Sequence, residues 1–318
     1  MVSTKVKKRI FLSSPHMSEE GYEMECCGFI GSRVVDTLLE RRYEVIVVDD
    51  LRTGNITNIP YGQVNFFKCD IMSSSFEQII HITEPDFIIH QAIDTPKNKT
   101  SNESFYNEHI LSSIRLFDLA KKYAIQKVIF PSSGQVYGEA DYVPIDTRHP
   151  VKQTDEYSIA KSTIELYVKF LGIDYTILRY SDVYGPLEAG SCEAGYITTF
   201  APYIMQGKPI AMHPYQTRDF IFVDDVAEAT VLALQKGRGQ TLHVSTGIGT
   251  TLQDLISLME QELHTSAQVH PKTLTNSEIL HNVLENKETK ELLQWEPKTN
   301  LQEGIRLSLC WERYLHYN

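Results

Sequence analysis

The sequence predicts an α/β fold, with helices on both faces of a doubly wound parallel sheet and a smaller C-terminal α/β lobe. Apolar runs rich in β-branched residues alternate with helical patterns through the first 180 residues. The run 45–48 (VIVV) has no polar residue, which indicates a strand buried on both faces. Asp49, Asp70 and Ser133 come at or just past the ends of such runs. Because parallel sheets bind ligands at the carboxyl ends of their strands, we expect a binding site there.

Hydrophobic periodicity places the expected elements in order along the chain. Strands are expected at Arg9–Ser13, Glu44–Asp49, Val64–Lys68, Asp86–His90, Lys127–Ser132 and Tyr175–Arg179. Helices are expected between them at Ser32–Arg42, Ser75–His81, Glu103–Tyr123 and Asp155–Leu171, and later at Asp224–Leu234, Leu252–Leu263 and Leu301–Leu315. The stretch from Leu187 to Tyr196 is rich in glycine and small residues and indicates a loop. We therefore expect residues 1–180 to form one domain and residues 181–318 to form mostly a second lobe, with some segments returning to the first.

Composition excludes several classes of protein. The net charge of −11 argues against a broad nucleic-acid surface and against binding to an anionic membrane. No stretch approaches the roughly 20 apolar residues that a membrane-spanning helix needs. The five cysteines are odd in number and lack metal-ligand spacing, which favours reduced thiols in a cytoplasmic protein without a metal site.

Three residues carry the strongest chemical signal: Ser133 at a strand end, and Tyr157 with Lys161 in the following helix. Residues four apart project from one helix face, so the phenol and the ammonium can point into one site. A phenol titrates at about 10 in water, and a lysine cation held nearby favours the phenolate. Such a phenol is a useful base near neutral pH, and a serine hydroxyl can bind the same substrate oxygen. The set suits removal of a proton from an alcohol while a hydride leaves its carbon.

The Tyr–Lys spacing alone is a weak signal, equally typical of an exposed helix face. A second instance, Tyr123 and Lys127, falls where a helix should give way to a strand, and we interpret it as coincidence. The position of Tyr157, two dozen residues after Ser133, favours the catalytic interpretation for the first pair.

The segment 28–32 (GFIGS) opens a helix, and the strand that follows ends in Asp49 about twenty residues further on. Glycines at such a place allow a pyrophosphate to approach the helix N-terminus, and the acid accepts hydrogen bonds from ribose hydroxyls. We therefore assign Gly28, Phe29, Ile30 and Gly31 to a dinucleotide site. Asp49 and the adjacent Asp50 favour NAD over NADP, because they would repel a 2′-phosphate. Asp70 and Ile71 follow the next strand and could flank the adenine.

The same segment departs from the usual fingerprint. Glu25 stands where the first glycine would fall, and the expected first strand ends some ten residues too early for a short turn. A carboxylate at this place would repel phosphates, so we expect weakened NAD binding and reduced activity. The alternative is that Gly28 and Gly31 only let the helix pack closely on a strand.

Together these blocks resemble the extended short-chain dehydrogenase/reductase family, especially its NAD-dependent nucleotide-sugar epimerases of the UDP-glucose 4-epimerase type. The resemblance runs from about Gly28 to the C-terminus. Its further blocks are 132–138 (SSGQVYG), 178–186 (LRYSDVYGP), 216–220 (QTRDF), 223–226 (VDDV) and 292–297 (LLQWEP). It implies a Rossmann-type domain with a tightly held NAD, a nucleotide-diphosphate sugar as substrate, and a homodimer formed through the helices 103–123 and 155–171.

The resemblance also implies a role for each site residue. Tyr157 would be the base, Lys161 would bind the nicotinamide ribose and tune Tyr157, and Ser133 would bind the reacting oxygen. Arg218 would meet the substrate diphosphate, with Asp182 and His281 near it in place of the usual asparagine and second arginine. Gln91 and Ala92, just after an expected strand, complete the predicted cofactor contacts.

The residues after Ser133 help to choose the reaction. The family's 4,6-dehydratases carry an acidic pair there and its decarboxylases a glutamate, whereas this chain has Gly134 and Gln135. Epimerisation by transient oxidation at the sugar C4 fits best. A 4-keto-sugar reductase would need the same residues, and Glu25, Asp182 and His281 leave open an impaired or non-catalytic relative. Residues 1–24 are atypical of the family and resemble the start of DegT-type aminotransferases, but no cofactor lysine accompanies them.

Overall fold

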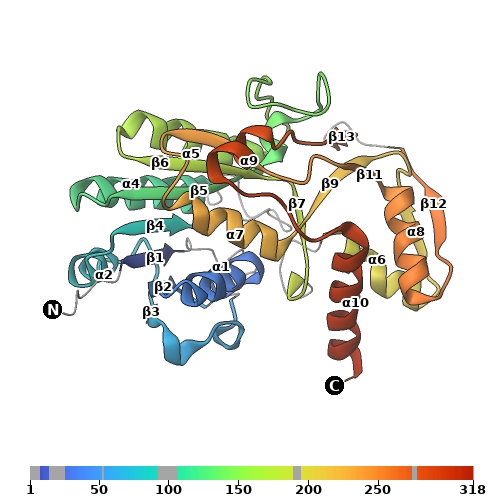
Figure 1. The fold of residues 1–318 in the computed structure, drawn as a ribbon, viewed down its shortest axis with the longest axis horizontal. Coiled ribbons are helices and arrows are strands. Elements are labelled where there is room, and N and C mark those ends of the chain that lie inside the picture. Colours follow the sequence, from blue (N-terminus) through green and yellow to red (C-terminus); the bar gives the residue numbers. More distant parts are fainter. Residues whose placement is uncertain are drawn as a thin grey trace.

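The computed structural model describes residues 8–13, 26–51, 54–91, 106–188, 195–273 and 278–317. A seven-stranded parallel sheet forms its centre, in the strand order β10-β6-β5-β4-β1-β2-β3 (Figure 1). These strands are β1 (Arg9–Ser13), β2 (Glu44–Asp49), β3 (Asn65–Lys68), β4 (Phe87–His90), β5 (Lys127–Ser133), β6 (Tyr175–Tyr180) and β10 (Gln240–Val244). Strands β1 to β6 lie in the doubly wound Rossmann order 3-2-1-4-5-6, and β10 adds a seventh strand beside β6. The predicted fold class is therefore confirmed.

Successive residues of each strand point to opposite faces of this sheet and form two separate cores. In β1, Ile10 and Leu12 pack toward α1 (Phe29–Glu40) and α7 (Val223–Ala233). Phe11 lies in the other core, which α2 (Phe76–Thr83), α4 (Ser112–Lys122) and α5 (Glu156–Leu171) cover. This burial on both faces explains the unbroken apolar runs within β1, β2, β4 and β5.

Helix boundaries follow local capping chemistry. Asp155 caps α5, since its carboxylate accepts a hydrogen bond from the Ser158 amide at 2.7 Å, and Ser158 caps in return. Gly172, with φ of 73°, ends this helix. α1 begins at Phe29, three residues before the predicted start. Gly28 is its N-cap, while the Ser32 hydroxyl bonds back to the Phe29 carbonyl inside the helix.

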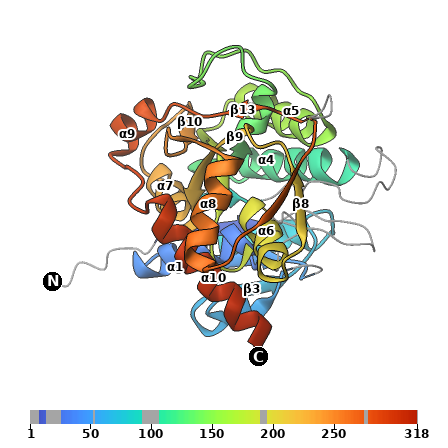
Figure 2. The ribbon, with the colours of Figure 1, turned by 90° about the vertical axis from the view of Figure 1, so that its right-hand side faces the viewer.

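The smaller lobe lies to one side of the main sheet (Figures 1 and 2). Its four-stranded sheet consists of β7 (Asp182–Tyr184), β9 (Thr217–Phe222), β11 (Gly249–Thr251) and β13 (His281–Asn282). A second pair is formed by β8 (Pro209–Met212) and β12 (Gln268–Pro271). Its helices are α6 (Tyr196–Met205), α8 (Leu252–Leu263) and α10 (Leu301–Tyr317), which share one apolar core.

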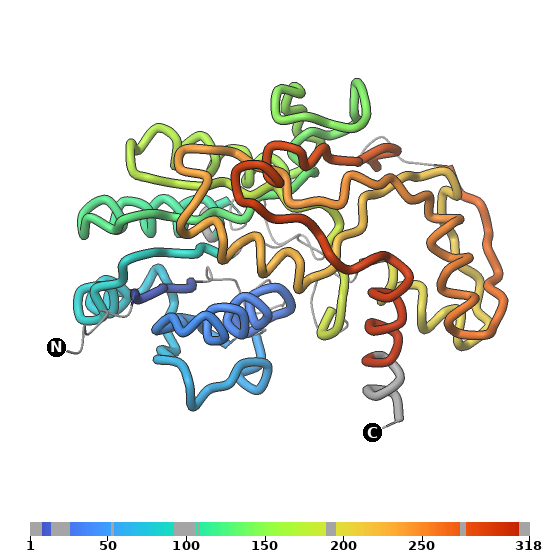
Figure 3. Tube along the Cα trace, in the orientation of Figure 1, coloured from blue at the N-terminus to red at the C-terminus, as the bar shows by residue number. Residues whose placement is uncertain are grey.

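The chain leaves this lobe and returns to the main sheet, a path that Figure 3 follows. β10 pairs with β6 at the sheet edge, and α9 (Lys287–Leu293) lies nearby. Three short 3₁₀ segments, η1 (Ile56–Asn58), η2 (Tyr61–Gln63) and η4 (Gly134–Tyr137), and one π-helical turn, η3 (Asn107–Leu111), complete the described elements. No helix among the described residues is long and apolar enough to cross a membrane.

Candidate active site

A cavity of about 460 Å³ opens at the carboxyl ends of β4, β5 and β6, where the smaller lobe meets the main sheet. Eight of the predicted site residues line it together: Phe29, Ile30, Gln91, Ser133, Tyr157, Lys161, Asp182 and Arg218. They come from six different elements or strand ends, spread over some 190 residues of sequence. The fold therefore gathers residues of the predicted dinucleotide, catalytic and diphosphate sites around one space.

The three residues predicted to be catalytic, Ser133, Tyr157 and Lys161, all line this cavity. Tyr157 and Lys161 are one turn apart on α5, and both are buried to more than nine-tenths. The Lys161 ammonium donates a hydrogen bond to the Pro131 carbonyl of β5 at 2.9 Å and lies 5.6 Å from the centre of the Tyr157 ring. Ser133 ends β5, where its Oγ accepts a hydrogen bond from the Gln135 amide at 3.1 Å. This bond leaves the serine hydroxyl's own proton for another acceptor.

Two buried histidines lie behind Lys161 and stay neutral. Burial, and secondarily the positive charge of Lys161, lowers the pKa of His90 to about 3. The same two causes lower the pKa of His109 to about 3, with a smaller contribution from His90. His90 is fixed by hydrogen bonds with Ser13 at 3.1 Å and Ser113 at 2.8 Å. Near neutral pH neither histidine therefore adds a positive charge beside Lys161.

Arg218 on β9 lines the cavity from the smaller lobe. Its guanidinium donates to the Ile279 carbonyl at 3.2 Å and lies 5.8 Å from the centre of the Tyr196 ring. Asp182, the first residue of the neighbouring β7, also lines the cavity. Burial raises the pKa of the Asp182 carboxyl, and the charge of Arg218 opposes that shift. An anionic group of a ligand would thus meet a buried guanidinium with a carboxylate close by.

Only some of the residues predicted to bind the dinucleotide line the cavity. Gly28 is the N-cap of α1 and provides no side-chain hydrogen bond, and Phe29 and Ile30 in the first turn of this helix line the cavity. Asp49 ends β2 and is fully buried. Its carboxylate accepts hydrogen bonds from the Cys27 amide at 3.0 Å and the Leu51 amide at 2.8 Å. Asp49 therefore holds the turn before α1 against the end of β2.

Several other predicted residues lie away from the described cavity wall. Asp70 accepts a hydrogen bond from the Met72 amide at 2.7 Å, and Ile71 is fully buried in the core that contains Ile46. His281 lies on β13 beside β9, with its Nδ1 3.2 Å from Glu139 Oε1. Gly31 and Asp50 are buried near α1 and β2 without lining the cavity. Glu25 and Ala92 lie outside the described residues.

The structure adds cavity residues that the sequence analysis did not assign. Gln135 lies two residues after Ser133 in η4, and Gln216 lies two residues before Arg218. Their closeness in sequence to predicted site residues could have indicated that they also line the cavity. Tyr196 and the Lys272–Glu278 ion pair, 2.8 Å long, come from the lobe, where the sequence predicted a loop or no element. α6 starts at Tyr196, so the expected loop from Leu187 to Tyr196 is wrong at its last residue, while residues 189–194 lie outside the described part of the chain.

The two side chains of the second Tyr–Lys pair bind different partners. Lys127 donates to the carbonyls of Ala233 and Lys236 at 2.7 and 2.5 Å, whereas the Tyr123 hydroxyl donates to Glu77 at 3.0 Å. Neither residue lines the cavity. These separate contacts agree with the interpretation of this spacing as coincidence.

The doubly wound sheet and the Tyr157–Lys161 pair beside a serine at a strand end are features of the extended short-chain dehydrogenase/reductases. Within that class, the chain belongs to the NAD dependent epimerase/dehydratase family, whose sequence model matches residues 27–245. A putative UDP-glucose 4-epimerase of Methanocaldococcus jannaschii is 34% identical over 293 residues, which cover 89% of this chain and 95% of that protein.

Solved structures agree with this assignment. The UDP-glucose 4-epimerase of Thermotoga maritima, solved with UDP-glucose, is 30% identical and superposes with a TM-score of 0.86 over 97% of this chain and 99% of that one. The UDP-glucose 4-epimerase of Thermus thermophilus, solved with NAD, is 28% identical, with a TM-score of 0.83 over 96% and 99% of the two chains. The predicted family is therefore confirmed.

Proposed function

We propose that the protein is an NAD-dependent UDP-hexose 4-epimerase. The observation that carries the proposal is one cavity that Ser133, Tyr157 and Lys161 line from the main domain and Arg218 lines from the smaller lobe. The first group suits proton removal from an alcohol, and the guanidinium suits an anionic diphosphate. The relatives of known structure that are named for this activity support the same reaction. In this proposal residues 1–180 hold the dinucleotide, and residues 181–318 mostly hold the sugar nucleotide.

The residues present fit a dinucleotide. The uncapped first turn of α1 reaches the cavity through Phe29 and Ile30 and suits a pyrophosphate. The ribose hydroxyls would approach Asp49, beside the two amides that it already binds. Lys161 and Tyr157 would face the nicotinamide end. Gly31, Asp50, Asp70, Ile71, Gln91 and Ala92 stay predicted neighbours of the cofactor. When bound, NAD accepts a hydride from the sugar and returns it.

The chain's own residues then supply the proton chemistry. Tyr157 takes the proton of the sugar C4 hydroxyl as the hydride leaves that carbon, and returns a proton after the keto sugar has turned. Lys161, held by the Pro131 carbonyl, keeps a positive charge near the phenol and favours its ionised form. Ser133 donates a hydrogen bond to the reacting oxygen, since its other contact is as an acceptor. Arg218 holds the diphosphate, with Asp182 and His281 as its predicted neighbours.

The turn after Ser133 favours epimerisation over dehydration. A Cβ atom at Gly134 would lie 3.0 Å from Asn282 Oδ1 and 3.0 Å from Leu284 Cδ1, and both of these side chains are buried. An acidic side chain at this position would therefore require buried neighbours to shift. Gln135, which lines the cavity, is neutral. Neither position 134 nor position 135 therefore supplies an acid for the elimination of water.

The proposal predicts that the purified protein releases about one equivalent of NAD on denaturation. It also predicts that the protein interconverts UDP-glucose and UDP-galactose without added NAD. Enzymatic cycling measures the released NAD, and chromatography of the nucleotide sugars measures the conversion. A 4-keto-sugar reductase would instead consume one NADH for each keto sugar reduced. Absence of NAD, with no binding of added NAD, would point to the impaired relative and to an effect of Glu25.

We further propose that the protein is a homodimer formed through α4 and α5, which lie side by side and are joined by a 2.6 Å hydrogen bond from Tyr167 to Asp118. Ile159, Leu166 and Phe170 follow one another along the outer face of α5, and Leu166 and Phe170 are 68% and 83% exposed. Such a stripe is costly to leave in water and suits a second copy of the same helix pair.

Light scattering after size exclusion should therefore give a dimer at micromolar concentration, and Leu166→Glu with Phe170→Glu should give a monomer. Ile82→Glu is the matched control, because Ile82 on α2 is 67% exposed outside this stripe. A monomeric wild type, or equal effects of the two changes, would contradict the proposed interface.

A further inference from the structure

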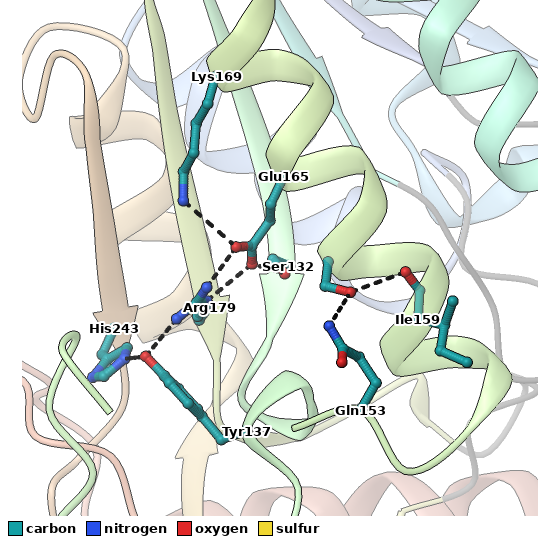
Figure 4. A network of polar contacts seen from close by, with 9 residues as sticks. Ser132, Tyr137, Gln153, Ile159, Glu165, Lys169, Arg179 and His243 are labelled. Carbon is teal, nitrogen blue, oxygen red and sulfur yellow. Dashed lines mark hydrogen bonds and ion pairs between the residues drawn. The ribbon is translucent and has the colours of Figure 1, made fainter. Parts of the chain in front are cut away.

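A buried ion pair joins α5, the helix that carries Tyr157 and Lys161, to the strand β6 (Figure 4). Glu165 lies on α5 one turn beyond Lys161, and Arg179 lies on β6. Arg179 Nε and Nη2 donate to the two carboxylate oxygens of Glu165 at 2.9 and 2.5 Å. The two side chains are 5% and 3% exposed, so this bidentate contact is shielded from water.

Glu165 also binds the residue directly before Ser133, and Arg179 also binds a residue four positions after it. The Ser132 hydroxyl donates to Glu165 Oε1 at 2.6 Å, and Ser132 directly precedes Ser133 on β5. Arg179 Nη1 donates to the Tyr137 hydroxyl at 2.5 Å, and Tyr137 ends the turn η4 that Ser133 caps. The ion pair therefore holds the backbone before and after Ser133.

Hydrogen-bond directions fix the rest of the network. The Tyr137 oxygen accepts from Arg179, so its own proton goes to His243 Nε2 at 2.6 Å. His243 Nδ1 then donates to the Glu285 carbonyl at 2.8 Å, because a carbonyl can only accept. Burial lowers the pKa of His243 to about 4 and raises the pKa of Tyr137 to about 12. One arrangement of protons therefore holds near neutral pH.

Stability alone is a poor explanation for such a pair. Removing two charges from water costs about as much as their attraction returns, and an apolar pair of similar size is often as stable. None of Glu165, Arg179, Tyr137 and His243 is among the described cavity-lining residues. The network connects α5, which carries Tyr157, directly and through β6 to the segment of β5 and η4 that contains Ser133.

We propose that Glu165 and Arg179 are positioning residues that fix the Ser133 hydroxyl relative to the Tyr157 phenol. The inference rests on the proposed function, in which both groups must reach one substrate oxygen. They stand on different elements, and a displacement of about 1 Å can cost about 10²-fold in rate. The contact from Ser132 to Glu165 sets the separation between β5 and α5, and the contact from Tyr137 to Arg179 sets the turn.

A double-mutant cycle with Ser133→Ala tests this role. We expect Glu165→Gln to lower kcat by about 10- to 100-fold, with the KM for the sugar nucleotide and the NAD content unchanged. Ser133→Ala should lower kcat in the wild type but change it little in the Glu165→Gln background, because the serine is already out of place. If the two losses multiply, Glu165 acts independently of Ser133 and the positioning role is overturned.

Two further variants keep the test decisive if Glu165→Gln folds poorly. Glu165→Leu with Arg179→Met removes both charges and should keep a melting temperature near that of the wild type while kcat stays low. Tyr137→Phe removes only the hydrogen bond from Arg179 to the turn η4. It should give the same non-additive loss of kcat with Ser133→Ala. Multiplying losses in both variants would likewise overturn the role.

The matched control is Asp225→Asn. Asp225 is also a buried carboxylate, which accepts hydrogen bonds from the Lys298 and Thr299 amides at 2.9 and 3.0 Å away from the cavity. Its effect on kcat should be small and should multiply with that of Ser133→Ala. An inactive wild type would overturn the proposed function and the positioning role together, whereas an active wild type with multiplying losses would overturn the positioning role alone.

Discussion

Tyr157→Phe should reduce turnover by about 10²- to 10⁴-fold while the protein keeps its NAD. The substitution removes one oxygen and leaves the buried ring, so the packing of α5 against β5 changes little. Without the phenol, no group at this position can take the C4 proton, although Lys161 still binds the Pro131 carbonyl. The measurement is the rate of UDP-hexose interconversion, together with NAD released on denaturation.

Tyr123→Phe is the matched control for this substitution. Tyr123 belongs to the other tyrosine–lysine spacing, and its hydroxyl binds Glu77 outside the cavity. We expect its turnover to equal that of the wild type. Equal turnover of Tyr157→Phe and the wild type would exclude Tyr157 as the base, whatever the NAD content.

Arg218→Met should raise the KM for the sugar nucleotide by about 10- to 150-fold, the value of one charged hydrogen bond of roughly 1.5–3 kcal/mol. Methionine keeps much of the buried stem but removes the guanidinium, and Asp182 then stands without the opposite charge that Arg218 provides. The carboxylate would add repulsion against a diphosphate. Because the lost contact lies far from the reacting carbon, kcat should change much less than KM.

A second substitution separates these two contributions. Asp182→Asn in the Arg218→Met background removes the repulsive charge and should recover part of the lost affinity. Isothermal titration with UDP, which lacks the sugar, should report the same losses as KM if Arg218 binds the diphosphate. Unchanged UDP affinity in Arg218→Met would contradict that assignment.

The sequence by itself predicted six of the seven strands of the main sheet, all but β10, and it predicted that Tyr157 and Lys161 share one helix face near Ser133. Strands buried on both faces must be apolar throughout, so β2 and β5 are visible as continuous runs. Tyr157 and Lys161 share a helix, and their common direction follows from helical geometry alone. Asp155 and Gly172, which cap that helix, are also local signals.

Only the tertiary structure decided which distant residues share the cavity. Asp182 and Arg218 come together because β7 pairs with β9 across 36 residues of sequence, and β13, which also pairs with β9, carries His281, which contacts Glu139. Glu165, Arg179 and Tyr137 meet through the packing of α5, β6 and η4, which no local period specifies. Helix and strand periods are set by the backbone's own geometry, whereas side chains from separate elements meet only after the chain has closed on itself.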